Sequence, residues 1–188
     1  EYTGEGFVAE GARVGYLPQE LSTARENLAR FGKRDFNELL FVGGSHPPNV
    51  DALVWFVTEV MPLVRAVRPS TRLNVVGSTS SSEIAQLESE SVVLRGRLSD
   101  EELAKLYATV GLAVIPLRFG GGVKGKTIEA LVHATPFVAT DVGMQGLFPT
   151  EPIGYVAVEA QAFADAVLRA QTDRQATRKN VEQGLRFI

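Results

Sequence analysis

The sequence of 188 residues contains no cysteine, which excludes disulfide bonds, thiol catalysis and a zinc site built from cysteines. No apolar run approaches the roughly 18 residues that a membrane-spanning helix needs, so we expect no membrane segment in this chain. The balance of 19 Lys and Arg against 22 Asp and Glu gives a formal charge of −3. Because general nucleic-acid binding needs a concentrated basic surface, this balance argues against a nucleic acid as partner.

What is present is the composition of a globular domain, with 45% hydrophobic and 22% charged residues. A chain of this length can close one hydrophobic core. Residues 1–33 are expected to be a connector and leading segment, and residues 34–188 to form one domain. The first residue is Glu1, not Met, and no signal-peptide pattern follows. We therefore expect the chain to be a fragment or a processed form, with a partner domain missing from it.

Short apolar runs alternate with amphipathic stretches from residue 34 onward, which indicates strands that alternate with helices. The expected strands are residues 39–42, 73–76, 92–94, 112–115, 137–139 and 153–158. Continuous Val, Leu and Ile runs are typical of parallel strands buried on both faces. Each parallel crossover needs a helix-length return, and such crossovers are right-handed. The sequence therefore predicts an α/β fold, a doubly wound Rossmann-like parallel sheet with helices on both faces, in one domain.

Helix boundaries can be read from capping residues. We expect Asn49 to cap the helix after the first strand and Pro62 to kink or shorten that helix. Ser80 with Glu83, and Ser99 with Glu102, have the spacing of capping boxes. The last two helices are expected at residues 159–171 and 173–186.

The segment PLRFGGGVKGKTIEA, residues 116–130, lies where the fold predicts a ligand crevice, beyond the carboxyl end of a strand. Its consecutive glycines would let backbone amides approach a ligand, and the next helix, starting near Val123 or Lys124, would aim its positive end there. The cations Arg118, Lys124 and Lys126 complete a candidate phosphate or diphosphate site. Glu129, one turn after Lys126, would repel phosphate but could accept hydrogen bonds from a sugar diol.

A structural interpretation of the same segment stays open, in which the glycines only turn the chain and Lys126 and Glu129 form an exposed pair. The residues Gly120 to Thr127 also satisfy the P-loop pattern GxxxxGK[ST]. A P-loop role is disfavoured because Lys126 falls inside the predicted helix and no acidic strand end accompanies it.

Several blocks in order resemble the C-terminal, donor-binding domain of GT-B glycosyltransferases, the group 1 or family 4-like retaining enzymes. The blocks are FVGGSHPPNVDALVWF at 41–56, VVGS at 75–78, VVLRGRLSDEELAKLYA at 92–108, PLRFGGGVKGKTIEALVHATPFVAT at 116–140 and DVGMQGL at 141–147. The similar region covers well over half of the chain. It is specific for the family and unspecific for the substrate.

This resemblance implies a nucleotide-sugar site and a role for each matching residue. Arg118 and Lys126 would face the donor diphosphate as the catalytic cations, and Glu129 would hold the ribose hydroxyls. The further implied binding residues are Gly43, Gly44, Gly121 and Gly122 in the glycine-rich loops beside the phosphates, Arg95 and Gly96 along the base, and Thr127 with a hydroxyl for the diphosphate.

The chain departs from the family pattern at three places. Many relatives carry a second glutamate facing the donor sugar at the position of Gly121, and many carry an Arg and a Lys in the first glycine-rich loop, which here reads GGSHPPN. A further mild departure is Ala134, where glycine is usual. We interpret these changes as subgroup character, which leaves recognition of the donor sugar open.

The implied activity is transfer of a sugar from a nucleoside-diphosphate sugar, of UDP or GDP type, to an acceptor hydroxyl. No metal and no cofactor are expected, because Arg118, Lys126 and helix amides would stabilise the leaving diphosphate. The acceptor, a glycan or lipid, would bind through the missing N-terminal domain. The fragment is expected to bind nucleotide and to be inactive alone. We expect a cytoplasmic protein, with any peripheral membrane contact made by the absent domain.

Both histidines and two aromatic residues fit structural roles, and other classes of protein stay open. The only histidines are His46, interpreted as a solvated loop residue that could alternatively touch a phosphate or sugar, and His133, interpreted as a helix-end residue. Trp55 and Phe56 are expected in the core. A non-catalytic Rossmann-like binding or scaffold module and a sugar-nucleotide epimerase-type enzyme stay open. A nicotinamide dehydrogenase is disfavoured because no GxGxxG follows the first strand.

Overall fold

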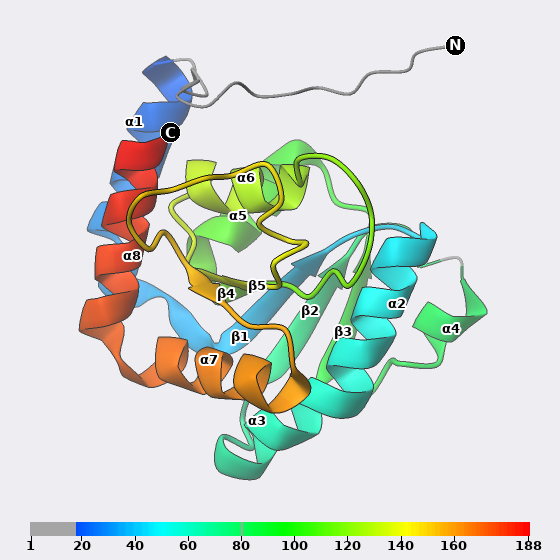
Figure 1. The fold of residues 1–188 in the computed structure, drawn as a ribbon. Helices are drawn as coiled ribbons and strands as arrows, with labels where there is room; N and C mark the ends of the chain where they lie inside the picture. The colour runs from blue at the N-terminus through cyan, green and yellow to red at the C-terminus, as the bar shows by residue number, and fades with distance from the viewer. Residues whose placement is uncertain (1–17, 80) are drawn as a thin grey trace.

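The computed structural model describes residues 18–79 and 81–188 and contains a six-stranded sheet in the order β3-β2-β1-β4-β5-β6 (Figure 1). The strands are β1 (Asp35–Val42), β2 (Arg72–Val76), β3 (Val92–Gly96), β4 (Val110–Ile115), β5 (Phe137–Ala139) and β6 (Tyr155–Val156). All neighbouring strands pair in parallel. The predicted doubly wound sheet is confirmed, and the expected sixth strand is short.

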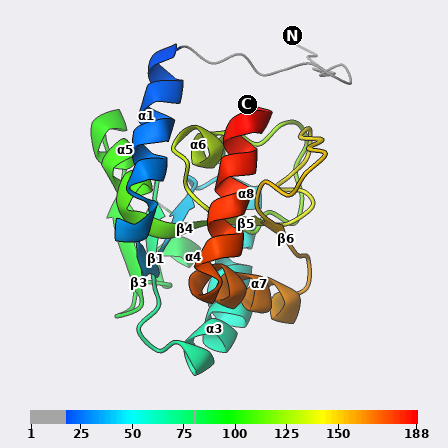
Figure 2. The same ribbon diagram turned by 90° about the vertical axis from the view of Figure 1, so that its left-hand side faces the viewer.

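Helices cover both faces of this sheet. They are α1 (Pro18–Ala29), η1 (Phe31–Lys33), α2 (Pro47–Trp55), η2 (Phe56–Val60), α3 (Met61–Val67), α4 (Ser82–Ala85), α5 (Asp100–Thr109), α6 (Gly125–Val132), α7 (Ala160–Thr172) and α8 (Arg174–Phe187). Figures 1 and 2 show α3 and α7 on one side of the sheet and α5 and α6, with α1 and α8, on the other. No helix among the described residues is both long and apolar enough to cross a membrane.

The central strands supply the core. Every residue of β4 is buried, and Leu39 of β1 lies in register with Leu73 of β2 and Leu112 of β4. The buried aromatic rings of Trp55 and Phe56 pack edge-on against Phe163 of α7, which confirms that both belong to the core. These contacts fix α2 and α7 to the same face of the sheet.

The crossover from β1 to β2 differs from the prediction at its start. His46 is the N-cap and prolines occupy the first turn, where a missing backbone N–H does no harm, so Asn49 lies inside α2 and is not its cap. The α-helix is interrupted by the π-helical segment η2, and α3 begins at Met61, next to Pro62. This interruption falls where the proline was expected to kink the helix.

The leading segment belongs in part to the packed unit. Ala24 and Phe31 are buried with Phe36, Ala134 and Val181 in a second, smaller core. The boundary that we expect at residue 34 therefore falls inside the packed unit, while residues 1–17 lie outside the described residues.

A buried guanidinium, that of Arg34, joins the carboxyl-terminal ends of two helices. Its nitrogens donate to the backbone oxygens of Tyr107 at 2.5 Å, Val110 at 2.9 Å, His133 at 3.3 Å and Ala134 at 2.9 Å. Burial lowers the pKa of Arg34 to about 10, which leaves it charged at neutral pH. A cation at the negative ends of α5 and α6 is favourable, so Arg34 fixes these helices relative to β1.

Local capping is as expected at α5 and different at α4. Ser99 and Glu102 form the predicted capping box, and the Ser99 hydroxyl and amide lower the pKa of the Glu102 carboxyl. At α4 the N-cap is Ser81, whose hydroxyl donates to Glu83 at 2.8 Å. Ser80, the expected cap, lies outside the described residues.

Candidate functional site

The two central strands β1 and β4 define the switch point of the sheet, because the chain leaves them toward helices on opposite faces. Ligands of doubly wound folds bind beyond the carboxyl ends of the strands at such a point. Here the loop after β4 comes close to the beginning of α2: a Cβ on Gly120 would lie 3.7 Å from Pro48. The residues around this contact form the candidate site.

Lys126 lies in the first turn of α6 and reaches across to α2. Its ammonium donates to Asn49 Oδ1 at 2.5 Å and lies 5.3 Å from the centre of the Phe41 ring. Burial lowers the pKa of Lys126 to about 8, against a raising effect of Glu129 and a further lowering effect of Lys124. The backbone amides of Gly125 and Lys126 open the helix and have no intrahelical acceptor. A cation and helix amides together suit an anion.

Glu129 lies one turn later on the same face of α6. Its Oε2 accepts a hydrogen bond of 3.0 Å from the hydroxyl of Tyr107, which comes from α5. The Tyr107 ring is stacked on His133, with 4.9 Å between ring centres and 9° between planes. Burial, with the charge of Glu129, raises the pKa of Tyr107, so this hydroxyl keeps its proton. The turn therefore presents a cation and an oriented carboxylate side by side.

The glycine loop is held in place by Lys124, which we expected among the ligand-facing cations. The Lys124 ammonium donates to the carbonyl oxygens of Gly120 and Gly121, both at 2.8 Å, and to Gln145 Oε1 at 3.2 Å. Gly120 and Gly122 have φ angles of 118° and 75°, which side chains other than glycine rarely adopt. The loop conformation thus depends on glycine and on this lysine, whose pKa burial lowers.

Arg118 lies against the side of α2. Its Nε donates to Asp51 Oδ2 at 2.8 Å, a second nitrogen donates to Asp51 Oδ1, and the guanidinium lies 5.7 Å from the Trp55 ring centre. The hydrogen bond that Arg118 donates to Asp51 is the main cause that raises the pKa of Arg118. Arg118 borders an open groove of about 580 Å³ between α2, α4 and Phe119. Lys126 and Glu129 are therefore brought together, while Arg118 is held by another face of α2.

Three further expected binding residues already have partners in the fold. The Thr127 hydroxyl is buried and donates to Gly143 O at 2.6 Å, so it is not directed at a ligand. The Gly43 amide donates to Val76 O at 2.8 Å. Arg95 Nε donates to Asn74 Oδ1 at 3.0 Å.

The remaining glycines differ in what surrounds them. The Gly96 carbonyl accepts from the Gly77 amide at 2.9 Å. A Cβ at Gly44 would meet nothing nearer than Ser78 at 3.8 Å, and Gly121 and Gly122 have nothing within 4 Å. Backbone at Gly44, Gly121 and Gly122 is therefore open to close approach by a ligand.

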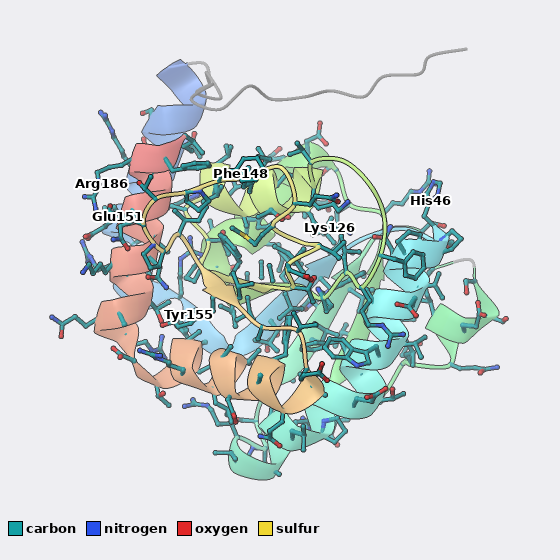
Figure 3. All side chains as sticks on the ribbon, viewed as in Figure 1. His46, Lys126, Phe148, Glu151, Tyr155 and Arg186 are labelled. Atoms are coloured by element: carbon teal, nitrogen blue, oxygen red, sulfur yellow. The ribbon has the colours of Figure 1, made fainter. Side chains whose placement is uncertain are left out.

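Neither histidine faces Lys126. His46 is the N-cap residue of α2 and lies apart from Lys126 in Figure 3, and His133 follows α6, where its ring stacks on Tyr107. Sequence reasoning missed Asn49 and Tyr107, the partners of Lys126 and Glu129. The only signal for Tyr107 was its place in the block at 92–108 that resembles the family.

The family of the chain follows from comparison with known proteins. Residues 37–173 match the family described as glycosyl transferases group 1, so the chain belongs to this family. An uncharacterised 44.6 kDa protein of the cps region of Klebsiella pneumoniae is 28% identical over 116 residues, which cover 57% of this chain and 30% of that protein. The chain thus spans less than a third of the length of this relative.

Similar folds occur in solved structures. A mutant of S. aureus TarM, solved with fondaparinux, alpha-GlcNAc-glycerol and UDP, has a TM-score of 0.67 at 20% identity, with 81% of this chain and 32% of that chain covered. Anabaena HepE, solved with UDP and glucose, has a TM-score of 0.66 at 16% identity, with 91% and 47% covered. The pneumococcal O-GlcNAc transferase GtfA, solved with UDP and GlcNAc, has a TM-score of 0.63 at 18% identity, with 84% and 34% covered. At these identities the similarity shows a common fold and nothing more. This chain spans less than half of each of these structures.

Proposed function

We propose that this chain is the donor-binding half of a glycosyltransferase, which moves a sugar from a nucleoside-diphosphate sugar to an acceptor hydroxyl. Membership of the glycosyl transferases group 1 family supports this function. The observation that carries it is the pairing of Lys126 and Glu129 on one turn of α6 at the switch point of the sheet. A cation and a carboxylate at this spacing suit a ligand that has an anionic group next to a diol.

In this proposal Lys126 stabilises the leaving diphosphate. Breaking the glycosidic bond builds negative charge on the diphosphate, and fixed positive groups stabilise that charge more in the transition state than in the ground state. Lys126 is held by Asn49 and the α6 amides are fixed by the helix, so neither needs to reorganise. Arg118 joins them only if it leaves Asp51, with which it forms a partly exposed ion pair through two hydrogen bonds.

In this proposal the Glu129 carboxylate binds the ribose of the nucleotide. Tyr107 occupies Oε2 of Glu129, and Oε1 can accept from the vicinal hydroxyls of a ribose. Gly121 and Gly122 allow the backbone to approach the phosphates. The UDP bound in TarM, HepE and GtfA supports UDP as the first nucleotide to test, with GDP as the alternative.

The proposal also covers the stereochemistry of the transfer, its need for a metal ion and the place where the acceptor binds. The transfer retains the configuration of the sugar and needs no metal ion, because Lys126 and the helix amides meet the charge of the diphosphate. The acceptor, a glycan or lipid, binds to a domain outside this chain. The chain alone binds the nucleotide and transfers nothing.

Isothermal calorimetry with UDP and GDP tests the proposal. We expect one of them to bind the 188-residue chain, Lys126→Ala to abolish that binding and Glu129→Ala to weaken it, and neither variant to lower the melting temperature by more than a few degrees. Lys105→Ala and Glu101→Ala are matched controls, because these residues form an exposed ion pair on α5. An affinity that is unchanged in both site variants would refute the site, and failure of both nucleotides to bind at millimolar concentration would refute the function.

A further inference from the structure

We infer that Tyr107 is a positioning residue for ribose recognition, which sets the orientation of the Glu129 carboxylate by donating a hydrogen bond to its Oε2. This inference rests on the proposed function, because it assigns the selectivity for ribose hydroxyls to a pair of residues and not to Glu129 alone. The pair joins two helices, since Tyr107 comes from α5 and Glu129 from α6.

The packing around Tyr107 fixes the position of its hydroxyl next to Glu129. The ring is 1% exposed and stacked on His133, so it cannot turn away from α6. Its hydroxyl lies 3.0 Å from Glu129 Oε2 at the partly buried edge of this packing. Because the pKa of Tyr107 is raised, the hydroxyl is the donor and the carboxylate the acceptor throughout the neutral range.

The backbone of Tyr107 is anchored as firmly as its ring. Its carbonyl oxygen accepts from the Arg34 guanidinium at 2.5 Å and from the Thr135 hydroxyl at 2.8 Å. Thr135 follows α6 and Arg34 also binds the carbonyl of Ala134, so the same contacts fix the end of the helix that carries Glu129. The distance from the hydroxyl to the carboxylate is therefore set by the fold.

An oriented carboxylate is of use only to a ligand that donates to it with defined geometry. A vicinal diol does so, whereas a nucleotide without ribose hydroxyls does not. Removing the hydroxyl of Tyr107 should therefore weaken the binding of ribonucleotides and spare that of dideoxynucleotides. A purely structural hydroxyl would affect both ligands equally.

The experiment compares UDP with 2′,3′-dideoxy-UDP on wild type and Tyr107→Phe by calorimetry. We expect the variant to bind UDP about tenfold more weakly, as the loss of one hydrogen bond to a charged group predicts, and to bind the dideoxy compound within about twofold of wild type. Tyr155→Phe is the matched control, because it removes a hydroxyl that pairs with Thr177 at 3.0 Å, and should change neither affinity. If wild type prefers GDP, the guanosine pair replaces the uridine pair.

Two results overturn the inference while the proposed function stands: UDP affinity unchanged in Tyr107→Phe, or equal losses for both ligands. Failure of wild type to bind either ribonucleotide overturns both. Should Tyr107→Phe not fold, the hydroxyl proton of Tyr107 in wild type gives the answer by NMR. Its resonance should shift when the ribonucleotide binds and stay in place with the dideoxy compound; the same response to both would overturn the inference.

Discussion

Lys126 gives the most specific prediction, a dependence of nucleotide affinity on pH that an ordinary lysine would not cause. Burial lowers the pKa of its ammonium from 10.5 to about 8 in the free protein. Only the charged form attracts a diphosphate, and the bound diphosphate in turn raises the pKa of the ammonium. Binding above pH 8 must therefore be accompanied by uptake of a proton, and the affinity should fall as the pH rises.

The magnitude follows from the fraction of free protein that carries the proton. With a pKa of about 8, that fraction is close to one at pH 7 and about one tenth at pH 9. The affinity for UDP should therefore fall about tenfold across this interval. The second ionisation of the phosphate, with a pKa of about 6, is complete before the interval begins.

In the free protein, stability should rise with pH from 8 toward 10.5, because the unfolded chain then keeps a proton that the folded chain has lost.

The assay is calorimetry with UDP between pH 7 and pH 9, in buffers of different ionisation enthalpy so that proton uptake is measured directly. Lys126→Arg is the control, since a guanidinium stays charged in this range and its affinity should not vary with pH. A flat profile for wild type, or an equal slope in Lys126→Arg, would contradict the assignment of the diphosphate to Lys126.

Two stability predictions follow from the packing behind the site, and both can be measured by urea unfolding. Arg34→Met should destabilise the chain by about 3 kcal/mol, because carbonyl oxygens at the ends of α5 and α6 lose a buried charged donor; a loss below about 1 kcal/mol would contradict this account. Ala134→Gly should change stability by less than about 0.5 kcal/mol, because relief of its φ of 49° offsets the loss of a buried methyl group. Ala130→Gly, at an equally buried position inside α6, should cost about 1–2 kcal/mol, and equal effects of the two glycines would refute the argument from φ.

The sheet could be predicted from the sequence because its signals are local. Buried strands such as β4 are continuous apolar runs, and the Ser99–Glu102 capping box spans a single helical turn. The place of the crevice follows from topology alone, since the carboxyl ends of parallel strands meet at one edge. Lys126 and Glu129 share a face because they are three residues apart on a helix.

The partners of these side chains could not be predicted, because they are distant in sequence. Lys126 and Asn49 are 77 residues apart, and Arg34 and Tyr107 are 73 residues apart. Asn49 has the residue type of a helix cap, but the prolines before it start the helix earlier. Thr127 follows Lys126 directly and therefore points about 100° away, into the protein and toward Gly143.

The position of bound nucleotide tests the central claim most directly. A crystal structure of this chain soaked with UDP, or with GDP if that nucleotide binds, should place the diphosphate within hydrogen-bond distance of Lys126 Nζ and the α6 amides. The ribose hydroxyls should lie on Glu129. A nucleotide bound elsewhere, for example in the groove beside Trp55, would contradict the account.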